Sequence, residues 1–413
     1  MPVVRDAAAN ALAPLTLDHA AALGVLVADD AEARALVTIA VHGDVLVTSD
    51  GDADADASPD HVGGVSLTTL TGLSLTHRAR IWRALDLGTG PGIQAIVAAA
   101  HSDEVVATDV NRRALAYARF NALLNDRPEI EVREGSLFEP VAGERFDLVL
   151  CNAPFVVSPD SRYLFRDAGT GGDELSEAVV RGTPEHLEPG GTATLVVSWL
   201  GGDDEDWAAR PRGWLEGSGC DAWVIGGQTL DPIAHAAKWN SILARDPEAH
   251  GAAIDRWTAY LAELGATAVT EGVLVLRKRA AGEPWFRADR LPAAAPESAD
   301  GQIARIFAAR DFLDGLPDDE ALLDAPLVLA ETARIDETSF VRDGKREVER
   351  IRLRLTEGVL FEADVDPRLA ETLLKLDGTT SVREAIGEDA PQERALAVLR
   401  EMLETGFLEA PAP

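Results

Sequence analysis

The spacing of apolar residues predicts a small unit of helices and strands in residues 1–80. A helical period occupies LDHAAALGVLV, and a second helix is predicted around Ala31–Val37. Short alternating runs near Ile39–Val41 and Asp44–Thr48 predict two strands. We expect this N-terminal α/β unit to lie on the substrate side of the site that the next region forms.

From residue 81 to about 280, apolar strands alternate with helical segments, which is typical of a parallel sheet covered by helices. The predicted strands are RALDLG, VVATDV, EIEVREG, FDLVLCNAPF, TATLVVSW, CDAWVIGG and TEGVLVLRKR. Before the last of them, a helical insertion at about 230–264 holds Trp239 and Trp257, which we predict to be core residues, with contact to a ligand as the alternative. An insertion at this point could cover the carboxyl ends of the strands, where α/β sheets bind ligands. The region is therefore predicted to be a Rossmann-like α/β domain.

The pattern changes again beyond this domain. Residues 281–300 are rich in proline and alanine and are predicted to be a linker. Residues 301–413 combine a helix (GQIARIFAARDFL), paired strands (EVERIRLRLTEGVLFEAD) and two closing helices. This predicts a separate C-terminal α+β domain that resembles a winged helix.

Composition and charge narrow the classes of partner. No apolar run is long enough to span a membrane, and the N-terminus lacks the basic start and apolar core of a secretory signal. Cys151 and Cys220 are the only cysteines, which gives neither a disulfide framework nor a zinc site. The net charge of -32 disfavours a nucleic acid partner, because an acidic surface repels phosphate. We expect a cytoplasmic protein with no membrane contact and no bound metal.

The strongest chemical signal is LDLGTGPG, at 85–92. Asp86 ends a predicted strand, and Gly88, Gly90 and Gly92 open the helix that follows. Glycine is needed where a backbone turns sharply or where a ligand comes closer than a Cβ atom allows. The helix N-terminus behind the glycines offers free N–H groups to a carboxylate.

Two classes of cofactor compete for this motif. Dinucleotide folds use the spacing G-x-G-x-x-G, whereas the spacing here is G-x-G-x-G with an acid two residues before the first glycine. Asp86 would repel a pyrophosphate but could hold the ammonium group of an amino-acid ligand, which favours S-adenosylmethionine over NAD. Asp109, at the end of the second strand, could accept hydrogen bonds from ribose hydroxyls.

A second motif, Asn152–Ala153–Pro154–Phe155, follows the fourth strand. An amide or aryl amine is a poor nucleophile because its lone pair is delocalised. The Asn152 carbonyl and the next backbone carbonyl could bind the two N–H groups of such a nitrogen and draw its lone pair toward a methyl group. Phe155 could stack on a planar acceptor. The alternative is a plain Asn-x-Pro turn, but the position after the fourth strand favours catalysis.

Residues 81–155 resemble the core of class I S-adenosylmethionine-dependent methyltransferases. NAPF resembles their Asn-Pro-Pro-Phe/Tyr motif, with Ala153 at the second position of the motif in place of proline. The stretch GSLFEPVAGERFDLVLCNAPF is similar to the enzymes that methylate release-factor glutamine and to ribosomal RNA guanine methyltransferases. The resemblance implies a class I methyltransferase sheet that binds S-adenosylmethionine and methylates a nitrogen atom.

The resemblance also implies a role for individual residues. Those expected to hold the methionine part of the cofactor are Asp86, Gly88, Thr89, Gly90 and Gly92. Those expected on its ribose and adenine side are Asp109, Val110, Ser136 and Leu137, where Ser136 replaces the acid usual in the family. Asn152 would border the cofactor and, with Pro154 and Phe155, act on the acceptor.

Three functions stay open at this point. An amide or amine of a peptide or protein is favoured as acceptor, because the C-terminal segment resembles winged-helix modules, including ones that bind peptide leaders in natural-product pathways. An RNA exocyclic amine would call for a basic stripe that the sequence lacks. A non-catalytic binding protein of the same fold would be expected to lose Asp109 or Asn152. His61 is a candidate base for an ammonium acceptor, with a core or surface histidine as the alternative.

Overall fold

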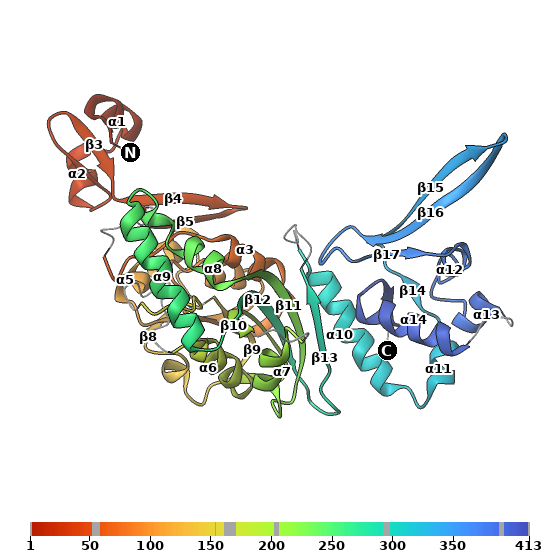
Figure 1. Cartoon of the computed structure of the whole chain (residues 1–413). Helices are drawn as coiled ribbons and strands as arrows, with labels where there is room; N and C mark the ends of the chain where they lie inside the picture. Colours follow the sequence, from red (N-terminus) through yellow and green to blue (C-terminus); the bar gives the residue numbers. More distant parts are fainter. Residues whose placement is uncertain are drawn as a thin grey trace. The chain divides into compact units, whose positions relative to one another are not determined.

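The chain forms two compact units, which we describe in a computed structural model (Figure 1). The first unit comprises residues 1–72 and 79–290, and the second comprises residues 73–78 and 291–413. The residues that the structure describes are 2–51, 58–152, 154–160, 171–201, 206–291, 298–387 and 392–411.

The first unit is built on an eight-stranded sheet with the order β13-β11-β12-β10-β9-β6-β7-β8. Its strands are β6 (Ile81–Leu87), β7 (Ser102–Asp109), β8 (Glu131–Glu134), β9 (Phe146–Cys151), β10 (Leu187–Gly201), β11 (Cys220–Leu230), β12 (Ala268–Lys278) and β13 (Phe286–Arg290). Within this sheet β12 runs antiparallel to both neighbours, and the other described pairs are parallel. The predicted Rossmann-like α/β fold is confirmed, since the sheet contains every strand predicted for the region.

Helices cover both faces of the sheet because successive strand residues point to opposite sides. The helices are α4 (Ile93–Ala98), α5 (Arg112–Leu124), α6 (Glu174–Gly182) and α7 (Ala209–Leu215). Leu85 and Leu87 of β6 belong to a core cluster with buried residues of α6 and α7. Ala84 belongs to the cluster on the other face, with residues of α4 and α5. The carboxyl ends of β6, β7 and β9 therefore meet at one edge of a three-layer core.

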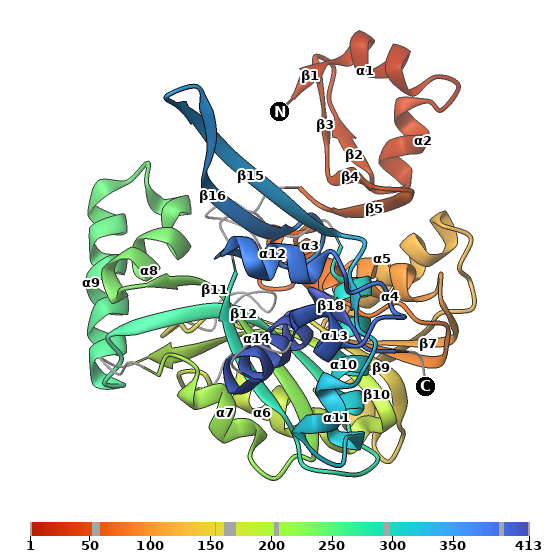
Figure 2. The same ribbon diagram turned by 90° about the vertical axis from the view of Figure 1, so that its right-hand side faces the viewer.

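The N-terminal part of this unit contains helices and strands, as predicted, but one predicted helix is wrong. Its elements are β1 (Val3–Val4), α1 (Arg5–Leu12), α2 (Leu17–Ala22), β2 (Leu26–Ala28), β3 (Glu32–Ala35), β4 (Val37–His42), β5 (Val45–Asp50) and α3 (Leu67–Ser74). The helix expected around Ala31–Val37 is replaced by β3, which lies between β1 and β2 (Figure 2). Hydrogen bonds to both neighbours outweigh the helix propensity of Glu-Ala-Arg-Ala.

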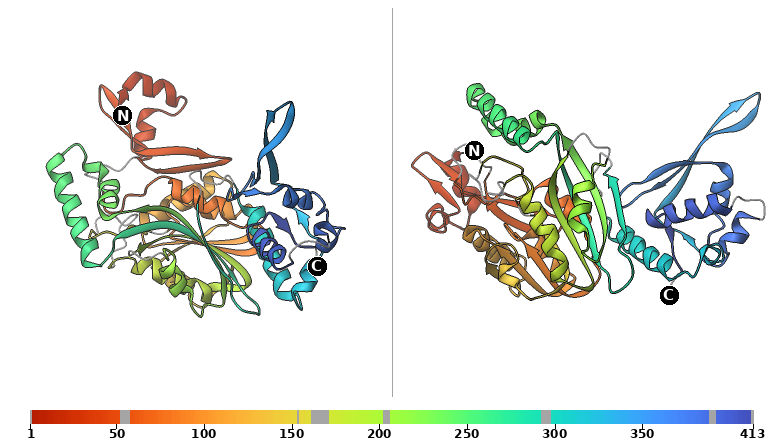
Figure 3. Two further views of the ribbon diagram at one scale, coloured as in Figure 1. Left: turned by 45° about the vertical axis from the view of Figure 1, so that its right-hand side comes forward. Right: turned by 60° about the horizontal axis from the view of Figure 1, so that its bottom comes forward.

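The predicted helical insertion consists of α8 (Pro232–Trp239) and α9 (Pro247–Glu263), which stand beside the sheet (Figure 3). Each helix starts with a proline behind an aspartate cap, Asp231 and Asp246, whose side chain accepts a backbone N–H of the first turn. Trp257 is fully buried, as predicted.

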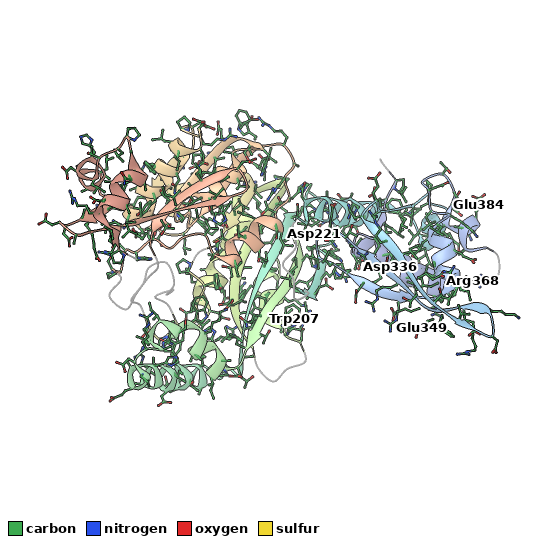
Figure 4. All side chains as sticks on the ribbon, turned by 90° about the horizontal axis from the view of Figure 1, so that it is seen from above. Trp207, Asp221, Asp336, Glu349, Arg368 and Glu384 are labelled. Atoms are coloured by element: carbon green, nitrogen blue, oxygen red, sulfur yellow. The ribbon has the colours of Figure 1, made fainter. Side chains whose placement is uncertain are left out.

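A buried carboxylate fixes the β13 end of the sheet. Asp221 of β11, labelled in Figure 4, is fully buried. It accepts hydrogen bonds from Arg277 and Arg279. It also accepts the backbone N–H of Trp285, immediately before β13. A charge buried this deeply is tolerated because it is paired and hydrogen-bonded. We therefore assign Asp221 to the structure of the sheet.

The second unit has an α+β arrangement with a core of its own, as expected for the C-terminal segment. Its elements are α10 (Asp300–Gly315), α11 (Asp319–Leu323), β14 (Val328–Leu329), β15 (Ala333–Arg342), β16 (Lys345–Leu355), β17 (Glu362–Val365), α12 (Pro367–Leu373), α13 (Val382–Ile386), α14 (Gln392–Glu404) and β18 (Leu408–Glu409). Asp336 and Glu349 lie on its long β15–β16 hairpin (Figure 4). The likeness to a winged helix stays a prediction. None of the helices described in either unit has the length and hydropathy needed to cross a bilayer.

Candidate functional site

A cavity of about 420 Å³ lies in the first unit, where the carboxyl ends of β6, β7 and β9 meet. Its size falls in the range typical of small-molecule sites. Five short segments supply most of its wall, together with one residue of the helical insertion.

The glycine-rich loop after β6 forms one wall. Gly88, Thr89 and Gly90 line the cavity, and both glycines have a left-handed φ, of 71° and 54°. Gly92 also has a left-handed φ, of 92°, but it lies outside the lining. A Cβ atom on Gly92 would stand 3.1 Å from the Cα of Ala118, so this glycine permits the close packing of α4 on α5.

Asp86 does not line the cavity, although we expected it to bind the cofactor. Because side chains alternate along β6, its carboxylate points to the face that α4 covers. There it is almost fully buried and accepts hydrogen bonds from Thr89 Oγ1 at 2.6 Å, Gln94 Nε2 at 3.1 Å and the Ala95 N–H at 2.9 Å. Asp86 thus holds the glycine-rich loop onto the start of α4, and a direct contact with a cofactor does not follow from its placement.

Burial raises the pKa of Asp86 to about 6, against the effect of its three hydrogen bonds. Between about pH 4 and pH 6, Asp86 is therefore protonated in the folded chain and ionised in the unfolded chain. The stability that Asp86 contributes is present below about pH 4, and we expect it to fall by about 3 kcal/mol as the pH rises through 6. Urea titrations of the wild type and Asp86→Asn across this range test the prediction. All eight tryptophans lie in the first unit, so their fluorescence reports on that unit. If the free energies of unfolding of the two proteins differ by the same amount at every pH, the prediction is contradicted.

The second wall follows β7. Asp109 lines the cavity, and its two carboxylate oxygens accept the N–H groups of Gly90 at 2.9 Å and Asn111 at 2.8 Å. Burial raises the pKa of Asp109. An ionised carboxylate offers about four acceptor positions, so further hydrogen bonds remain available to a ligand. The side chain of Asn111 caps α5, as predicted, and Val110 also lines the cavity.

The third wall follows β8. Ser136 and Leu137 both line the cavity, as does Gly135 before them. Leu137 has a φ of 48°, a left-handed conformation that leucine rarely adopts. Backbone strain of this kind gathers at functional sites, so Leu137 points to a constraint at this wall.

The fourth wall follows β9 and contains the residues predicted to act on an acceptor. Asn152, Pro154 and Phe155 line the cavity, while Ala153 lies outside the described residues. The Asn152 Nδ2 group donates to Thr69 Oγ1 at 2.7 Å. The Asn152 Oδ1 atom is buried and has no hydrogen-bond partner in the described part of the chain. A buried acceptor without a donor is costly, so a ligand that brings an N–H group to it would gain free energy.

The insertion contributes an aromatic residue to this wall. Trp239 of α8 lines the cavity and meets Phe155 edge-on, with ring centroids 6.5 Å apart and an interplanar angle of 79°. Trp239 therefore lies in the cavity wall and also packs against the buried cluster that contains Trp257. It is the last residue of α8, and the same buried cluster includes Val156 of the segment after β9.

The last wall is the segment from His61 to Thr69, which the sequence pattern did not assign to the site except for His61. It is tied to Asp50, which accepts the N–H of Val62 at 2.8 Å and is ion-paired with Arg113. Burial raises the pKa of Asp50, but hydrogen bonds from Arg113, Val62 and Tyr117 outweigh it and hold that pKa at about 2.

His61 lies at this wall, with Nδ1 3.9 Å from the Asp50 carboxylate. The role of His61 as a base stays a prediction. The sequence pattern did not indicate that Asp50 holds this wall in place. Asp50 is separated from its partners on α5 by more than sixty residues.

The described lining of the cavity contains carboxylate, amide, hydroxyl and imidazole groups but neither lysine nor arginine. Among the described residues, no group of three or more histidines, cysteines and acids is arranged to hold a metal ion. The site therefore suits an uncharged or cationic organic ligand held by backbone and carboxylate oxygens.

Residues 70–200 match the model of the methyltransferase small domain family. The match covers the glycine-rich loop, Asp109, Ser136 and the segment after β9. The resemblance to class I methyltransferases predicted from the sequence is therefore confirmed for this part of the chain.

Curated relatives match the same part. A release factor glutamine methyltransferase from Xylella fastidiosa is 35% identical over 129 residues, which cover 28% of this chain and 47% of that protein. A ribosomal protein uL3 glutamine methyltransferase from Bradyrhizobium diazoefficiens is 34% identical over 160 residues, which cover 35% of this chain and 50% of that protein. The chain thus spans about half the length of these relatives. Among solved structures, a ribosomal protein L11 methylase from Lactobacillus delbrueckii subsp. bulgaricus has a TM-score of 0.28 at 22% identity, covering 38% of this chain and 71% of that one.

Proposed function

We propose that this chain is an S-adenosylmethionine-dependent N-methyltransferase whose acceptor is a side-chain amide, such as that of glutamine, in a protein or peptide. The observation that carries the proposal is the buried, unpartnered Oδ1 atom of Asn152 in the wall of a cavity that the glycine-rich loop and Asp109 also line. The names of the curated relatives, which act on glutamine, support the amide over an amine.

The residues present fit this cofactor. The left-handed glycines leave room beside the loop for the amino-acid part, and the Asp109 carboxylate suits two ribose hydroxyls. Ser136 and Leu137 would border the adenine. When bound, S-adenosylmethionine supplies a methyl group on a positively charged sulfur. Asp86 supports the loop from behind, through the hydrogen bonds that it accepts from Thr89 and from the Ala95 N–H.

The acceptor side works by orientation and electrostatics. Asn152 Oδ1 would accept an N–H of the amide and so raise the electron density on its nitrogen, where positive charge develops. Asparagine carries no charge, so Asn152 remains neutral while the acceptor nitrogen becomes positive. Phe155 and Trp239 would flank the planar amide, an arrangement that aromatic faces and edges favour.

The lining argues against an RNA acceptor. A protein that holds RNA near its site needs basic groups along the phosphate backbone, and the described lining offers no lysine or arginine. The net charge of -32 adds repulsion. We also propose that residues 301–413 help to recognise the acceptor, in keeping with their separate core.

The test of this function is methyl transfer. Purified chain is incubated with labelled S-adenosylmethionine and fractionated lysate, and the product is treated separately with protease and nuclease. We expect the label to resist nuclease, to be released by protease and to map to a glutamine by mass spectrometry. Label that nuclease releases would replace the proposal with an RNA acceptor, and the absence of label in every fraction would overturn it.

A mutation tests the proposed cofactor site separately. Replacing Asp109 with alanine is expected to weaken S-adenosylmethionine binding by about 1.5–3 kcal/mol, because its charge-assisted hydrogen bonding to the cofactor is lost. Calorimetry measures the affinity, and NAD should bind neither protein. Asp103→Ala is the matched control, since Asp103 lies on the same strand in an exposed ion pair outside the cavity. Equal affinity of the wild type and Asp109→Ala would remove Asp109 from the site.

A further inference from the structure

The nitrogen and the oxygen of the Asn152 side-chain amide differ in their hydrogen bonding. Its Nδ2 group donates to Thr69 Oγ1 at 2.7 Å, whereas Oδ1 is left without a partner among the described residues. If the amide turned over, Nδ2 would take the place of Oδ1, and a donor would face the acceptor nitrogen in place of an acceptor. The orientation of this one side chain therefore decides whether the wall can bind an N–H group.

Thr69 is held rigidly enough to set that orientation. It is buried in the first turn of α3, and its backbone N–H donates to Ser66 Oγ just before that helix. The helix lies close to β10, since a Cβ atom on Gly72 would come within 2.9 Å of Val196. The Thr69 hydroxyl thus reaches Asn152 from an element packed on the central sheet.

A hydroxyl can donate as well as accept, so the neighbours of Thr69 matter. Ser66 Oγ lies 2.9 Å from Thr69 Oγ1 and 2.8 Å from Thr68 Oγ1. When Thr69 donates its one proton to Ser66, and Ser66 donates to Thr68, only lone pairs of Thr69 remain for Asn152. Such a chain of donors selects the NH2 group of the amide and keeps Oδ1 toward the cavity.

We propose that Thr69 is a positioning residue that fixes the Asn152 amide with Oδ1 available to the acceptor, through a hydroxyl chain that runs to Ser66 and Thr68. This inference rests on the proposed function for its catalytic consequence. The orientation itself is a property of the chain and can be measured without any substrate.

The decisive variant is Thr69→Val, which keeps the shape of the side chain and removes its hydroxyl. We expect kcat to fall about tenfold or more while the KM for the acceptor and the affinity for S-adenosylmethionine change less than twofold. Thr69→Ser should restore kcat, because it restores the hydroxyl. Thr71→Val is the matched control on the same helix, since the Thr71 hydroxyl bonds to the Leu67 carbonyl outside the cavity. Adding Thr69→Val to Asn152→Ala should cause no further loss.

A measurement without substrate separates this inference from the proposed function. NMR spectra of protein with selectively labelled asparagine show the side-chain amide of Asn152, identified by its loss in Asn152→Ala. In Thr69→Val this signal should shift and its protons should exchange faster, whereas Thr71→Val should leave it unchanged. An unchanged signal in Thr69→Val overturns the positioning role, whatever the activity. A shifted signal in a protein without methyl transfer supports the orientation and refutes the function.

Discussion

Replacing Asn152 with alanine is expected to lower kcat for methyl transfer about a hundredfold or more, with little change in the affinity for S-adenosylmethionine. The carbonyl of Asn152 would act where charge develops in the transition state, and the loss of one such preorganised group typically costs two to three orders of magnitude. Calorimetry and single-turnover rates on one preparation measure both quantities.

The control for this variant is Asn240→Ala, which changes another buried asparagine of the first unit. Asn240 follows α8 and donates to the Ala236 carbonyl, and it lies outside the lining of the cavity. Turnover of Asn152→Ala within a few fold of the wild type would mean that the motif after β9 is only a turn. His61 would then be the next group to test.

Replacing Asn121 with alanine is expected to destabilise the first unit by about 3–5 kcal/mol, an unusually large effect for one side chain. Asn121 is fully buried in α5. Its Oδ1 accepts the N–H and the hydroxyl of Thr48, and its Nδ2 donates to the carbonyls of Thr48 and Pro91. The substitution would leave these buried groups without partners, which costs more than the bonds themselves contribute.

Asn125, one helical turn further along α5, is a built-in comparison. It makes the same pair of hydrogen bonds to the N–H and carbonyl of Leu46, but in an exposed position. Asn125→Ala should cost only about 1 kcal/mol, because water can replace the lost bonds. Tryptophan fluorescence in urea compares the two variants. Similar losses in both would show that burial does not decide the contribution of Asn121.

The parts of the site that the sequence predicted are those encoded in short stretches. The glycine-rich loop, Asp109 and the motif that begins with Asn152 follow strands with a clear apolar pattern, and the topology of a parallel sheet brings strand ends together. Asp86 was placed correctly at the end of β6, but its hydrogen bonds to Thr89 and α4 were not foreseen, and its contact with the cofactor stays a prediction. The alternation of Leu85 and Leu87 with Asp86 would have assigned it to the other face of the sheet.

What could not be predicted depends on contacts between distant segments. No local pattern indicates that Thr69 meets Asn152 or that Asp50 ties down Val62 beside the cavity. The strand β3 was mistaken for a helix for the same reason, because its sequence favours a helix and only its two neighbours make it a strand. The N-terminal wall of the cavity could therefore not be predicted from the sequence, apart from His61.

The residues of the cavity wall lie far apart in the sequence, and this affects when the cavity can form during synthesis of the chain. The wall runs from His61 to Trp239, so most of the first unit must leave the ribosome before the wall is complete. Ribosomes add about 5 to 20 residues per second, so the segment that carries Thr69 waits on the order of ten seconds for its last partners. A nascent chain interrupted before α8 would hold the glycine-rich loop without the insertion that completes the acceptor side. Formation of the complete cavity is thus one of the last events in the synthesis of this unit.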